Sequence, residues 1–181
     1  MSDDRVIFGS AAEGLIRALG SKLDERAHHK FAQLGVPLRP RVLATYPRQA
    51  WIDSCVYAGE LLFPGRTPEE QRLMLGHRFI SSYSETIVGK ALITMLRLMG
   101  PRRSLERIER SFRTGMSHAD IGAKQLAPGH HEVTVANVSY SEWYQGMIEK
   151  GLELSGAQEL KVTVAKRDGD TVTYEVRWNA A

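Results

Sequence analysis

Apolar side chains recur every three or four residues through the first two thirds of the chain, the spacing at which side chains share one face of a helix. The longest such pattern lies within residues 67–114. In its middle, seven apolar residues share one face: Ile87, Val88, Ala91, Leu92, Met95, Leu96 and Met99. Because exposing so wide an apolar surface to water is unfavourable, other elements must cover it. We therefore predict that this segment forms the central core helix.

Residues that start and stop helices divide this part of the chain. The most complete start is at Thr67, which is followed by Pro68 and, three residues on, by Glu70. Threonine caps a free backbone N–H, and acidic side chains favour the positive end of a helix. Gly100 and Pro101 form the sharpest stop, because proline cannot continue the helical hydrogen bonds. The predicted helices cover residues 10–19, 21–34, 47–62, 67–99 with a kink near 81–84, and about 105–112.

Three serines are predicted to cap further helix starts. Ser10 stands three residues before Glu13, and Ser139 three residues before Glu142, which is the spacing of a capping box. Ser21 directly follows a glycine stop and is expected to cap the helix over 21–34.

The apolar period changes to two after Gly115, which is typical of strands buried on one face. Asp168 and Gly169 give a hairpin signal between the last two of these stretches. One more helix, over about 139–156, separates the two strand pairs. The predicted strands cover residues 122–126, 132–138, 160–164 and 172–178.

These elements predict an α+β fold in which an N-terminal helical layer packs on a C-terminal four-stranded antiparallel sheet of order β-β-α-β-β. We predict a single domain over residues 1–181, with the helical part at about 10–114 and the sheet part at about 120–179. Neither part is large, and the helices have surplus apolar surface to bury, so one shared core is favoured over two domains.

Composition places the chain among globular proteins, with 43% hydrophobic and 25% charged residues. No tract is long and apolar enough for a membrane span, and the start has no signal-peptide pattern. Cys55 is the only cysteine, which excludes an intrachain disulfide and a multi-cysteine metal site. We expect a cytoplasmic protein.

Positive charge is concentrated between residues 97 and 113. This stretch holds six arginines and two glutamates, a net +4 in a chain whose total is +3. Guanidinium groups could bind phosphate or an acidic protein surface, or they could pair with Glu106 and Glu109 on a solvated helix face. Nucleic acid is not expected, because the glutamates are interleaved with the arginines and no stacking aromatic lies beside the cluster; Phe112 is predicted to point inward. The candidate acidic-partner surface is Arg102, Arg103, Arg107, Arg110 and Arg113.

Metal binding and catalysis find little support in the sequence. Adjacent histidines, as at 130 and 131, point in different directions, and His118 with Asp120 supplies only two ligands. No nucleophile elbow or glycine-rich phosphate loop is present. We therefore expect neither a metal site nor an enzyme.

Aromatic residues of the last helix and strands are candidates for a ligand pocket, although such residues more often form the core of the sheet. Cys55 lies on an apolar helix stripe and is either a core residue or a thiol that faces an apolar tunnel and carries an acyl chain. The candidate pocket lining is Cys55, Trp143, Met147, Tyr174 and Trp178.

Three stretches carry a family resemblance: VIFGSAAEGLIRAL, LGHRFISSYSETIVGKALITMLRLMGPRRSLERIERSFRTG and WYQGMIEKGLELSGAQELKVTVAKRDGDTVTYEVRW. They resemble a paralogous family of myxobacterial proteins of unknown function over nearly the whole chain. That family is similar to the fold shared by haem-nitric-oxide-binding domains, vinyl-4-reductase-type ligand domains and Golgi transport-particle subunits. The resemblance implies N-terminal helices over an antiparallel sheet, with an apolar ligand between the layers or a partner bound through the helices.

The resemblance does not extend to haem binding. Haem members of the fold group hold the propionates with a Tyr-x-Ser-x-Arg motif, whereas this chain has Tyr83-Ser-Glu-Thr and Tyr140-Ser-Glu-Trp. We expect no cofactor.

Two functions follow as expectations. The first is a non-catalytic protein-interaction module that self-associates through helices, as a homodimer or with a related paralogue. The alternative is a small-molecule or lipid-binding sensor domain with an apolar cavity between helices and sheet.

Overall fold

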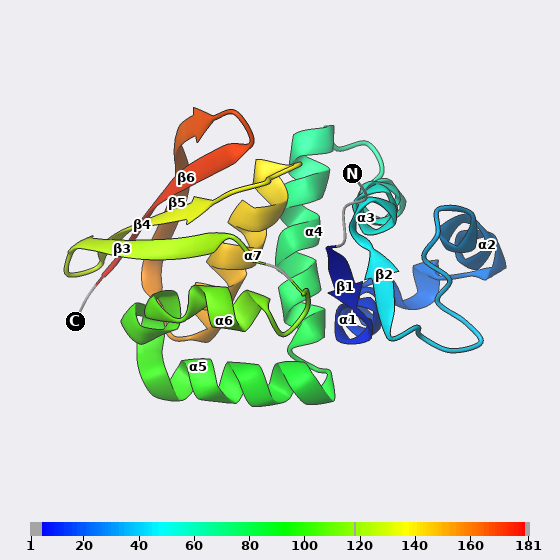
Figure 1. The fold of residues 1–181 in the computed structure, drawn as a ribbon, viewed down its shortest axis with the longest axis horizontal. Coiled ribbons are helices and arrows are strands. Elements are labelled where there is room, and N and C mark those ends of the chain that lie inside the picture. The colour runs from blue at the N-terminus through cyan, green and yellow to red at the C-terminus, as the bar shows by residue number, and fades with distance from the viewer. Residues whose placement is uncertain (1–4, 118, 180–181) are drawn as a thin grey trace.

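Helices precede a four-stranded sheet along the chain, as predicted (Figure 1). The computed structural model describes residues 5–117 and 119–179. The helical part contains β1 (Val6–Phe8), α1 (Gly9–Leu19), the 3-10 turn η1 (Gly20–Lys22), α2 (Glu25–Gln33), β2 (Thr45–Pro47), α3 (Arg48–Leu62), α4 (Pro68–Tyr83), α5 (Ile87–Glu106) and α6 (Ile108–Phe112). The sheet part contains β3 (Ile121–Ala127), β4 (His130–Val135), α7 (Ser141–Leu154), β5 (Gln158–Asp168) and β6 (Thr171–Asn179).

The sheet has the strand order β3-β4-β6-β5, and all its neighbouring strands are antiparallel. The predicted order β-β-α-β-β is therefore confirmed. Alternate residues of β4 and β6 are buried, among them Val133 and Tyr174, which are paired in register. This inner face is covered by α7, the end of α5 and α6, so the sheet buries one side, as its period of two predicts.

The prediction of the central helix is wrong. The helix at the centre of the molecule is α4, which contacts α1, α3 and α7 and stands upright in the middle of Figure 1. Its inward face carries Leu75, Gly76, Phe79 and Tyr83, all buried. The predicted helix over 67–99 ends instead at Tyr83, because Thr86 caps a new helix by accepting a hydrogen bond from the Gly89 N–H.

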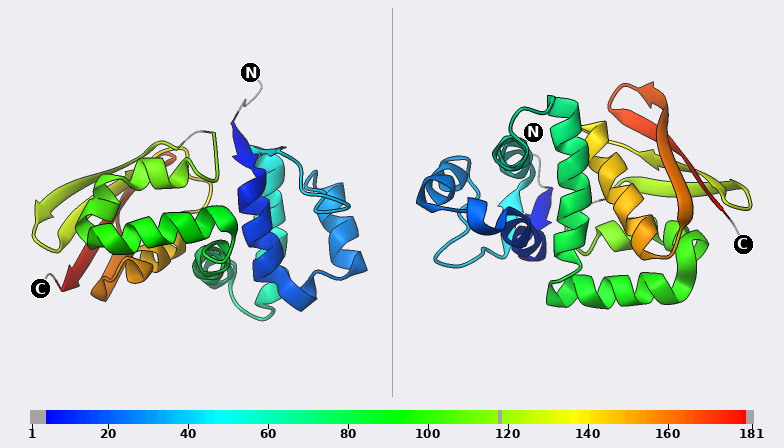
Figure 2. Two further views of the ribbon diagram at one scale, coloured as in Figure 1. Left: turned by 90° about the horizontal axis from the view of Figure 1, so that it is seen from below. Right: turned by 180° about the vertical axis from the view of Figure 1, so that it is seen from behind.

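Helix α5 crosses the ends of α4 and α7 on the outside of the molecule (Figure 2, right). Before Gly100 it buries Gly89, Ile93 and Leu96, while Ile87 is 88% exposed and Leu98 84% exposed. Its apolar residues surround the helix, so one side meets the core and the other meets solvent. At Gly100 the backbone turns with a positive φ of 74°, a conformation that glycine adopts without strain.

Of the four predicted side-chain caps, the one at Thr67 forms and those at Ser10, Ser21 and Ser139 do not. Thr67 accepts from the Glu70 N–H at 3.3 Å, and Glu70 accepts from the Thr67 N–H at 3.0 Å, so this capping box is confirmed. Ser10 and Ser139 do not cap. Ser10 lies inside α1 and donates to the Thr114 carbonyl, because the preceding strand β1 already sets where the helix begins.

Ser21 also fails to cap, because it lies within the turn η1. The cap of α2 is Asp24, which accepts from the Ala27 N–H at 2.8 Å. The start of this helix is therefore displaced toward the C-terminus relative to the prediction.

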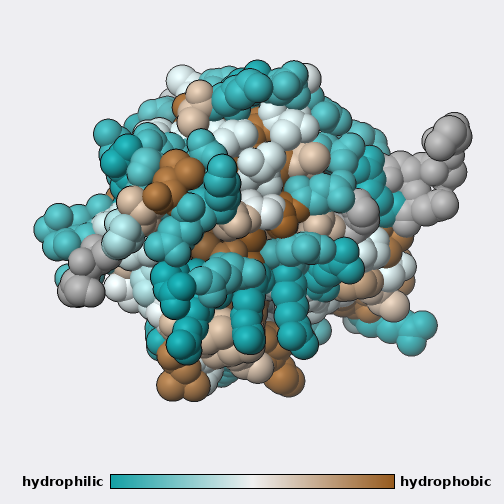
Figure 3. Space-filling view, turned by 60° about the vertical axis from the view of Figure 1, so that its left-hand side comes forward, coloured by the Kyte–Doolittle hydropathy of each residue, from teal (hydrophilic) through white to brown (hydrophobic). Residues whose placement is uncertain are grey.

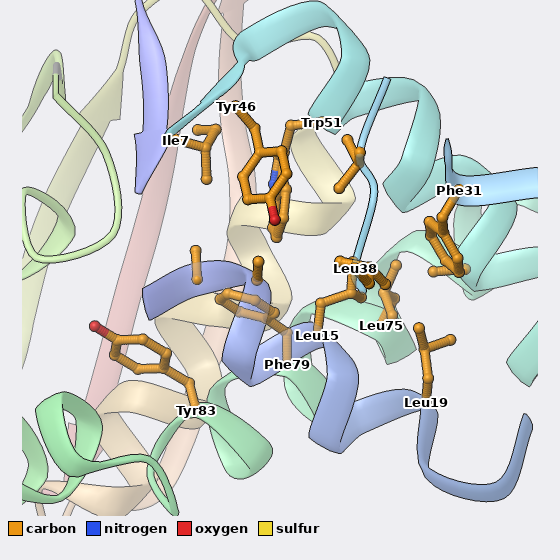
Figure 4. Close-up of a cluster of buried hydrophobic side chains, with 14 of the residues drawn as sticks. Ile7, Leu15, Leu19, Phe31, Leu38, Tyr46, Trp51, Leu75, Phe79 and Tyr83 are labelled. Carbon is orange, nitrogen blue, oxygen red and sulfur yellow. The ribbon is translucent and has the colours of Figure 1, made fainter. Parts of the chain in front are cut away.

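Two hydrophobic clusters form the core. The first joins α1, α2, α3 and α4 and includes Leu15, Trp51 and Phe79 (Figure 4). The second lies between the sheet, α6 and α7 and includes Val133 and Tyr174. Phe112, Met116 and Tyr144 contact both clusters, so the region where the clusters meet lies between the helical layer and the sheet. Among the described residues, no helix is long and apolar enough to cross a membrane.

Candidate functional site

A cavity of about 110 Å³ lies between the helical layer, the end of α5 and α7. We call it the apolar chamber. Aliphatic and aromatic side chains from several elements line it, including Phe79, Leu92, Leu96, Leu105, Met147 and Leu152. The chamber exists where the two hydrophobic clusters meet without filling the space between them.

The hydroxyl groups of the apolar chamber are used by the chain itself. Ser104 donates to the Gly100 carbonyl at 2.8 Å, and Thr114 donates to the Ser111 carbonyl at 2.8 Å. Tyr83 shares a hydrogen bond with Thr114 at 3.1 Å. A ligand would therefore meet an apolar wall, because the polar atoms already have partners.

A second cavity of about 80 Å³ adjoins the first and has a different rim. We call it the polar cavity. Its lining includes the charged residues Arg5, Arg48, Arg72 and Asp120, together with Cys55 and Tyr144. Arg48 begins α3 and donates to the Asn137 carbonyl at 2.5 Å and to Ser139 at 3.3 Å. The helical layer and the loop after β4 are thus joined at this cavity.

Arg72 is held on the rim of the polar cavity by three neighbours. It pairs with Glu142 at 3.2 Å and Glu69 at 3.0 Å, and its guanidinium lies 4.6 Å from the centre of the Tyr140 ring. Burial raises the pKa of Glu142, but hydrogen bonds and Arg72 lower it further, so the net pKa lies below its ordinary value. The pair is therefore charged on both sides at neutral pH.

Tyr144 places a hydroxyl at the polar cavity. Within the described residues this hydroxyl has no hydrogen-bond partner, whereas the hydroxyls of Tyr46, Tyr83 and Tyr174 all have one. Burial raises the pKa of Tyr144, against a smaller opposing effect of the Arg48 charge. The hydroxyl stays protonated at neutral pH and can donate a hydrogen bond.

The two cavities share a wall. Five residues line both of them: Ile7, Trp51, Phe112, Met116 and Trp143. Phe79 of the apolar chamber contacts both tryptophans, with ring centres 6.3 Å from Trp51 and 5.2 Å from Trp143. In Figure 4, Trp51 lies beside Tyr46 and above Phe79. The cavities are therefore neighbours that share these five residues as a wall.

The structure brings three of the five candidate pocket residues to these cavities. Cys55 lines the polar cavity, Met147 lines the apolar chamber and Trp143 lines both. Burial raises the pKa of the Cys55 thiol, which keeps it protonated and unreactive.

Tyr174 and Trp178 belong to the sheet instead. Tyr174 is fully buried and donates to the Ser141 carbonyl at 2.8 Å. Trp178 stacks on His131 with ring centres 4.8 Å apart. Neither side chain is part of the lining of the two cavities.

The candidate arginine surface lies on the outside, on the end of α5 and on α6. Arg102 pairs with Glu106 and Arg113 with Glu109, each at 2.8 Å and one helical turn apart. Arg103, Arg107 and Arg110 are exposed. None of the five lines either cavity.

Sequence reasoning missed Arg48 and Arg72, although a signal exists for both. Each begins an apolar helix stripe: Arg48 precedes Ile52 and Cys55, and Arg72 precedes Leu75 by one turn. A charge at the end of an apolar stripe lies where a buried face meets solvent, which is where a cavity can open.

No group of three metal-binding side chains occurs in the described part of the chain. His118, half of the predicted two-ligand pair, lies outside the described residues. His131 is 1% exposed, and both of its ring nitrogens lack a hydrogen-bond partner. Burial lowers the pKa of His131, so the ring is neutral.

Comparison with known proteins identifies the family. Residues 5–179 match the family described as "Protein of unknown function (DUF2378)". The chain belongs to this family. A search of curated proteins finds no match.

Solved structures similar to this member of the DUF2378 family are H-NOX proteins. An H-NOX protein from S. oneidensis has a TM-score of 0.73 at 7% identity, over 95% of this chain and 96% of that chain. A variant of Tt H-NOX has a TM-score of 0.69 at 16% identity, over 96% of both chains. An H-NOX mutant from K. algicida has a TM-score of 0.58 at 14% identity, over 95% of this chain and 96% of that chain. The likeness shows a shared α+β fold.

Proposed function

We propose that this protein is a ligand-binding sensor domain that holds an apolar small molecule in the chamber between α4, α5 and α7. The observation that carries the proposal is the chamber itself, about 110 Å³ in volume and lined by residues such as Leu92, Leu96 and Met147. An apolar protein cavity of ~150 Å³ binds benzene, so a chamber of this size suits a small apolar group.

Haem does not fit the side chains of the chamber. The similar structures include H-NOX proteins described with Fe(II) or haem, and haem iron is commonly held by a histidine or cysteine ligand. Among the described residues that line the chamber or the neighbouring polar cavity there is no histidine, and burial keeps the thiol of Cys55 protonated. The two cavities thus lack a histidine or thiolate ligand for iron, which favours a ligand other than haem.

We further propose that the domain binds its ligand without converting it. The polar side chains of the chamber, such as Ser104 and Thr114, donate to backbone carbonyls of their own helical turns. General acid–base chemistry needs a titratable group within hydrogen-bond reach of the substrate, and these hydroxyls offer none near neutral pH.

Binding of a small apolar probe tests the chamber. Benzene should raise the thermal stability of the wild-type protein and change the fluorescence of Trp51 and Trp143, with Trp178→Phe removing background. Leu96→Phe should fill the chamber and abolish both effects. Leu98→Phe is the matched control, because it adds the same ring on the same helix at an exposed position. The proposal fails if benzene has no effect on the wild-type protein, or if both variants respond alike.

A second candidate function is self-association through α5. Ile87, Ala91 and Leu98 form a stripe along its outer face, and Figure 3 shows apolar side chains projecting along the lower edge of the molecule, where α5 lies. A single large exposed apolar residue is common, but two at 88% and 84% exposure on one helix face favour a contact surface.

A second copy is the occupant that the charges fit. The stripe has Glu85 at one end, where it lies 3.9 Å from Arg17, and at the other end Arg97, which is exposed and donates to the Leu154 carbonyl. In an antiparallel two-fold dimer, Glu85 of each copy would lie near Arg97 of its partner. Antiparallel α5 helices would also place each Leu98 against the other copy's Ile87.

Sedimentation of the purified protein at micromolar concentration tests this candidate. The wild type should be a dimer and Leu98→Glu a monomer. Glu85→Arg should weaken the dimer, and adding Arg97→Glu should restore it, because the swap returns opposite charges to each end. Arg103→Gln, on the candidate acidic-partner surface, is the control and should leave the dimer unchanged. A monomeric wild type would contradict the candidate.

A further inference from the structure

The polar cavity is the strongest unexplained feature beside the chamber. Its lining holds three arginines and one aspartate, Arg5, Arg48, Arg72 and Asp120, over an otherwise largely apolar and aromatic wall. A concentration of guanidinium groups on a low-dielectric wall creates a positive potential. Glu142 and Glu69 offset the charge of Arg72, so the attraction of this rim for an oxyanion lies in the charged N–H donors that its three arginines bring together.

The arginines of this rim are positioned by contacts from three elements. Arg48, at the start of α3, reaches the loop after β4 through the Asn137 carbonyl, and Arg72, on α4, reaches α7 through Glu142. The Arg72 side chain is only 18% exposed. Preorganised guanidinium groups lose less entropy on binding an oxyanion than freely moving surface side chains do.

Tyr144 adds a neutral donor to the same cavity. Its hydroxyl has no hydrogen-bond partner in the described part of the chain, and its ring stacks on Phe112 with ring centres 6.0 Å apart. The Tyr144 side chain is partly buried, so its hydroxyl is accessible from the cavity and can donate to a group supplied from outside. An oxyanion next to the arginines would accept from it.

The shared wall connects this anion site to the apolar chamber. Trp51, Met116 and Trp143 line both cavities, and methionine side chains change shape easily. One molecule could therefore occupy both cavities if a movement of these side chains opened the wall. Its charged end would lie in the polar cavity and its apolar end in the chamber.

We infer that the ligand is an amphiphile with an anionic head group, a carboxylate or a phosphate, and a short apolar tail. The inference rests on the proposed function, because the tail occupies the same chamber. The head group is recognised by Arg48, Arg72 and the Tyr144 hydroxyl, and the tail is recognised by shape and burial.

Two probes of equal tail length separate the head group from the tail. Octanoate and octan-1-ol are titrated into the protein carrying Trp178→Phe, with the fluorescence of Trp51 and Trp143 as readout. Octanoate should bind about tenfold more tightly or better, since a charged hydrogen bond adds that much. Added salt should weaken the binding of octanoate and leave the binding of octanol unchanged. Octyl phosphate in place of octanoate tells which anion the site prefers.

Variants of the rim assign the head-group site. Arg48→Gln and Tyr144→Phe should each weaken the affinity for octanoate severalfold or more. Neither variant should change the affinity for octanol. Octanol binding by a variant also reports that its chamber is folded, and Tyr144→Phe keeps the ring contact with Phe112. Arg110→Gln, an exposed arginine outside both cavities, is the control and should change neither affinity.

Each outcome separates this inference from the function on which it rests. Equal binding of octanol and octanoate, or rim variants that leave octanoate unchanged, would overturn the anionic head group while the chamber stands. Binding of benzene without either eight-carbon probe would overturn the connection between the cavities. If benzene also fails to bind, the proposed function itself is wrong.

Discussion

Helices α4 and α5 reverse what their sequences indicate. Helix α5 has the denser apolar pattern, yet Ile87 and Leu98 are almost fully exposed. Helix α4 carries charged and polar residues on most turns, yet it packs against α1, α3 and α7 at the centre of the molecule. The burial of a helix depends on how many other elements pack against it, and its apolar content alone does not determine that burial.

Close approach to α4 depends on two glycines. A side chain at Gly76 would meet the Trp143 carbonyl of α7, and one at Gly146 would meet the Leu73 carbonyl of α4. The helices therefore touch backbone to backbone. The polar residues of α4 become links to neighbours: Arg72 pairs with Glu142 of α7, and Arg78 donates to the Ala18 carbonyl of α1.

The largest effect is expected from Gly76→Val. The added side chain would overlap backbone atoms of α7, which cannot move aside without parting the helices. We expect a loss of about 5 kcal/mol or more and little folded protein. Gly151→Ala is the control, because α7 is open there and alanine should add about 0.5–1 kcal/mol through helix propensity. Circular dichroism during urea unfolding measures both. A stable Gly76→Val protein would mean that α4 is not the central helix.

The next effect is expected from Leu75→Ala on α4. Leu75 is 1% exposed, so truncation removes apolar burial and leaves a cavity. We expect a loss of about 2–5 kcal/mol in the free energy of unfolding, measured by urea titration. A loss below about 1 kcal/mol would contradict the assignment of this face to the core.

Measuring stability as a function of pH tests whether the part of α5 beyond Gly100 packs near the buried His131. Burial lowers the pKa of His131 below the ordinary 6.5. The charges of Glu106 and Arg102, both on this part of α5, also act on the His131 ring. The unfolded chain binds a proton near pH 6.5 while the folded ring stays neutral, so stability should fall as the pH falls below 6.5. The slope is at most about 1.4 kcal/mol per pH unit from this group, ending at the folded pKa.

His131→Phe keeps an aromatic ring against Trp178 and removes the titration. The variant should lose less stability between pH 7 and pH 5.5 than the wild type, by at most about 1 kcal/mol. His28, whose pKa is also lowered, remains in the variant and contributes in the same direction. Identical pH profiles for wild type and variant would contradict the neutral, buried state of His131.

The smallest effect is expected from Leu98→Ala. Because Leu98 is 84% exposed, its truncation should change the free energy of unfolding by no more than about 0.5 kcal/mol, measured at a dilution that keeps the chain monomeric. A cost equal to that of Leu75→Ala would remove the contrast between α4 and α5.

Local signals predicted most of the fold. The capping box at Thr67, the break at Gly100 and the period-two strands depend on neighbouring residues, and each lies where it was predicted. Predicted caps failed where the serine side chain forms a hydrogen bond with a segment distant in the sequence instead of with its own helix. Ser10 donates to the Thr114 carbonyl and Ser139 accepts from Arg48, so neither serves as a cap.

The candidate site was less predictable. Met147, Trp143 and Cys55 were named because apolar and aromatic residues line cavities as well as cores, and all three lie at the cavities. Arg48 and Arg72 were missed. They lie 24 positions apart in the sequence and share a rim only because α3 and α4 form a helical hairpin beside α7.

The sequence by itself determined the elements, their order and the α+β class, because hydrogen bonds along the backbone, caps and apolar periods act over a few residues. Only the tertiary structure decided which helix is central and where the cavities lie. Those outcomes depend on how closely whole elements approach, as at Gly76 and Gly146, and on the space left between them. The apolar chamber and the polar cavity arise from that packing, beside a wall that Trp51 and Trp143 share.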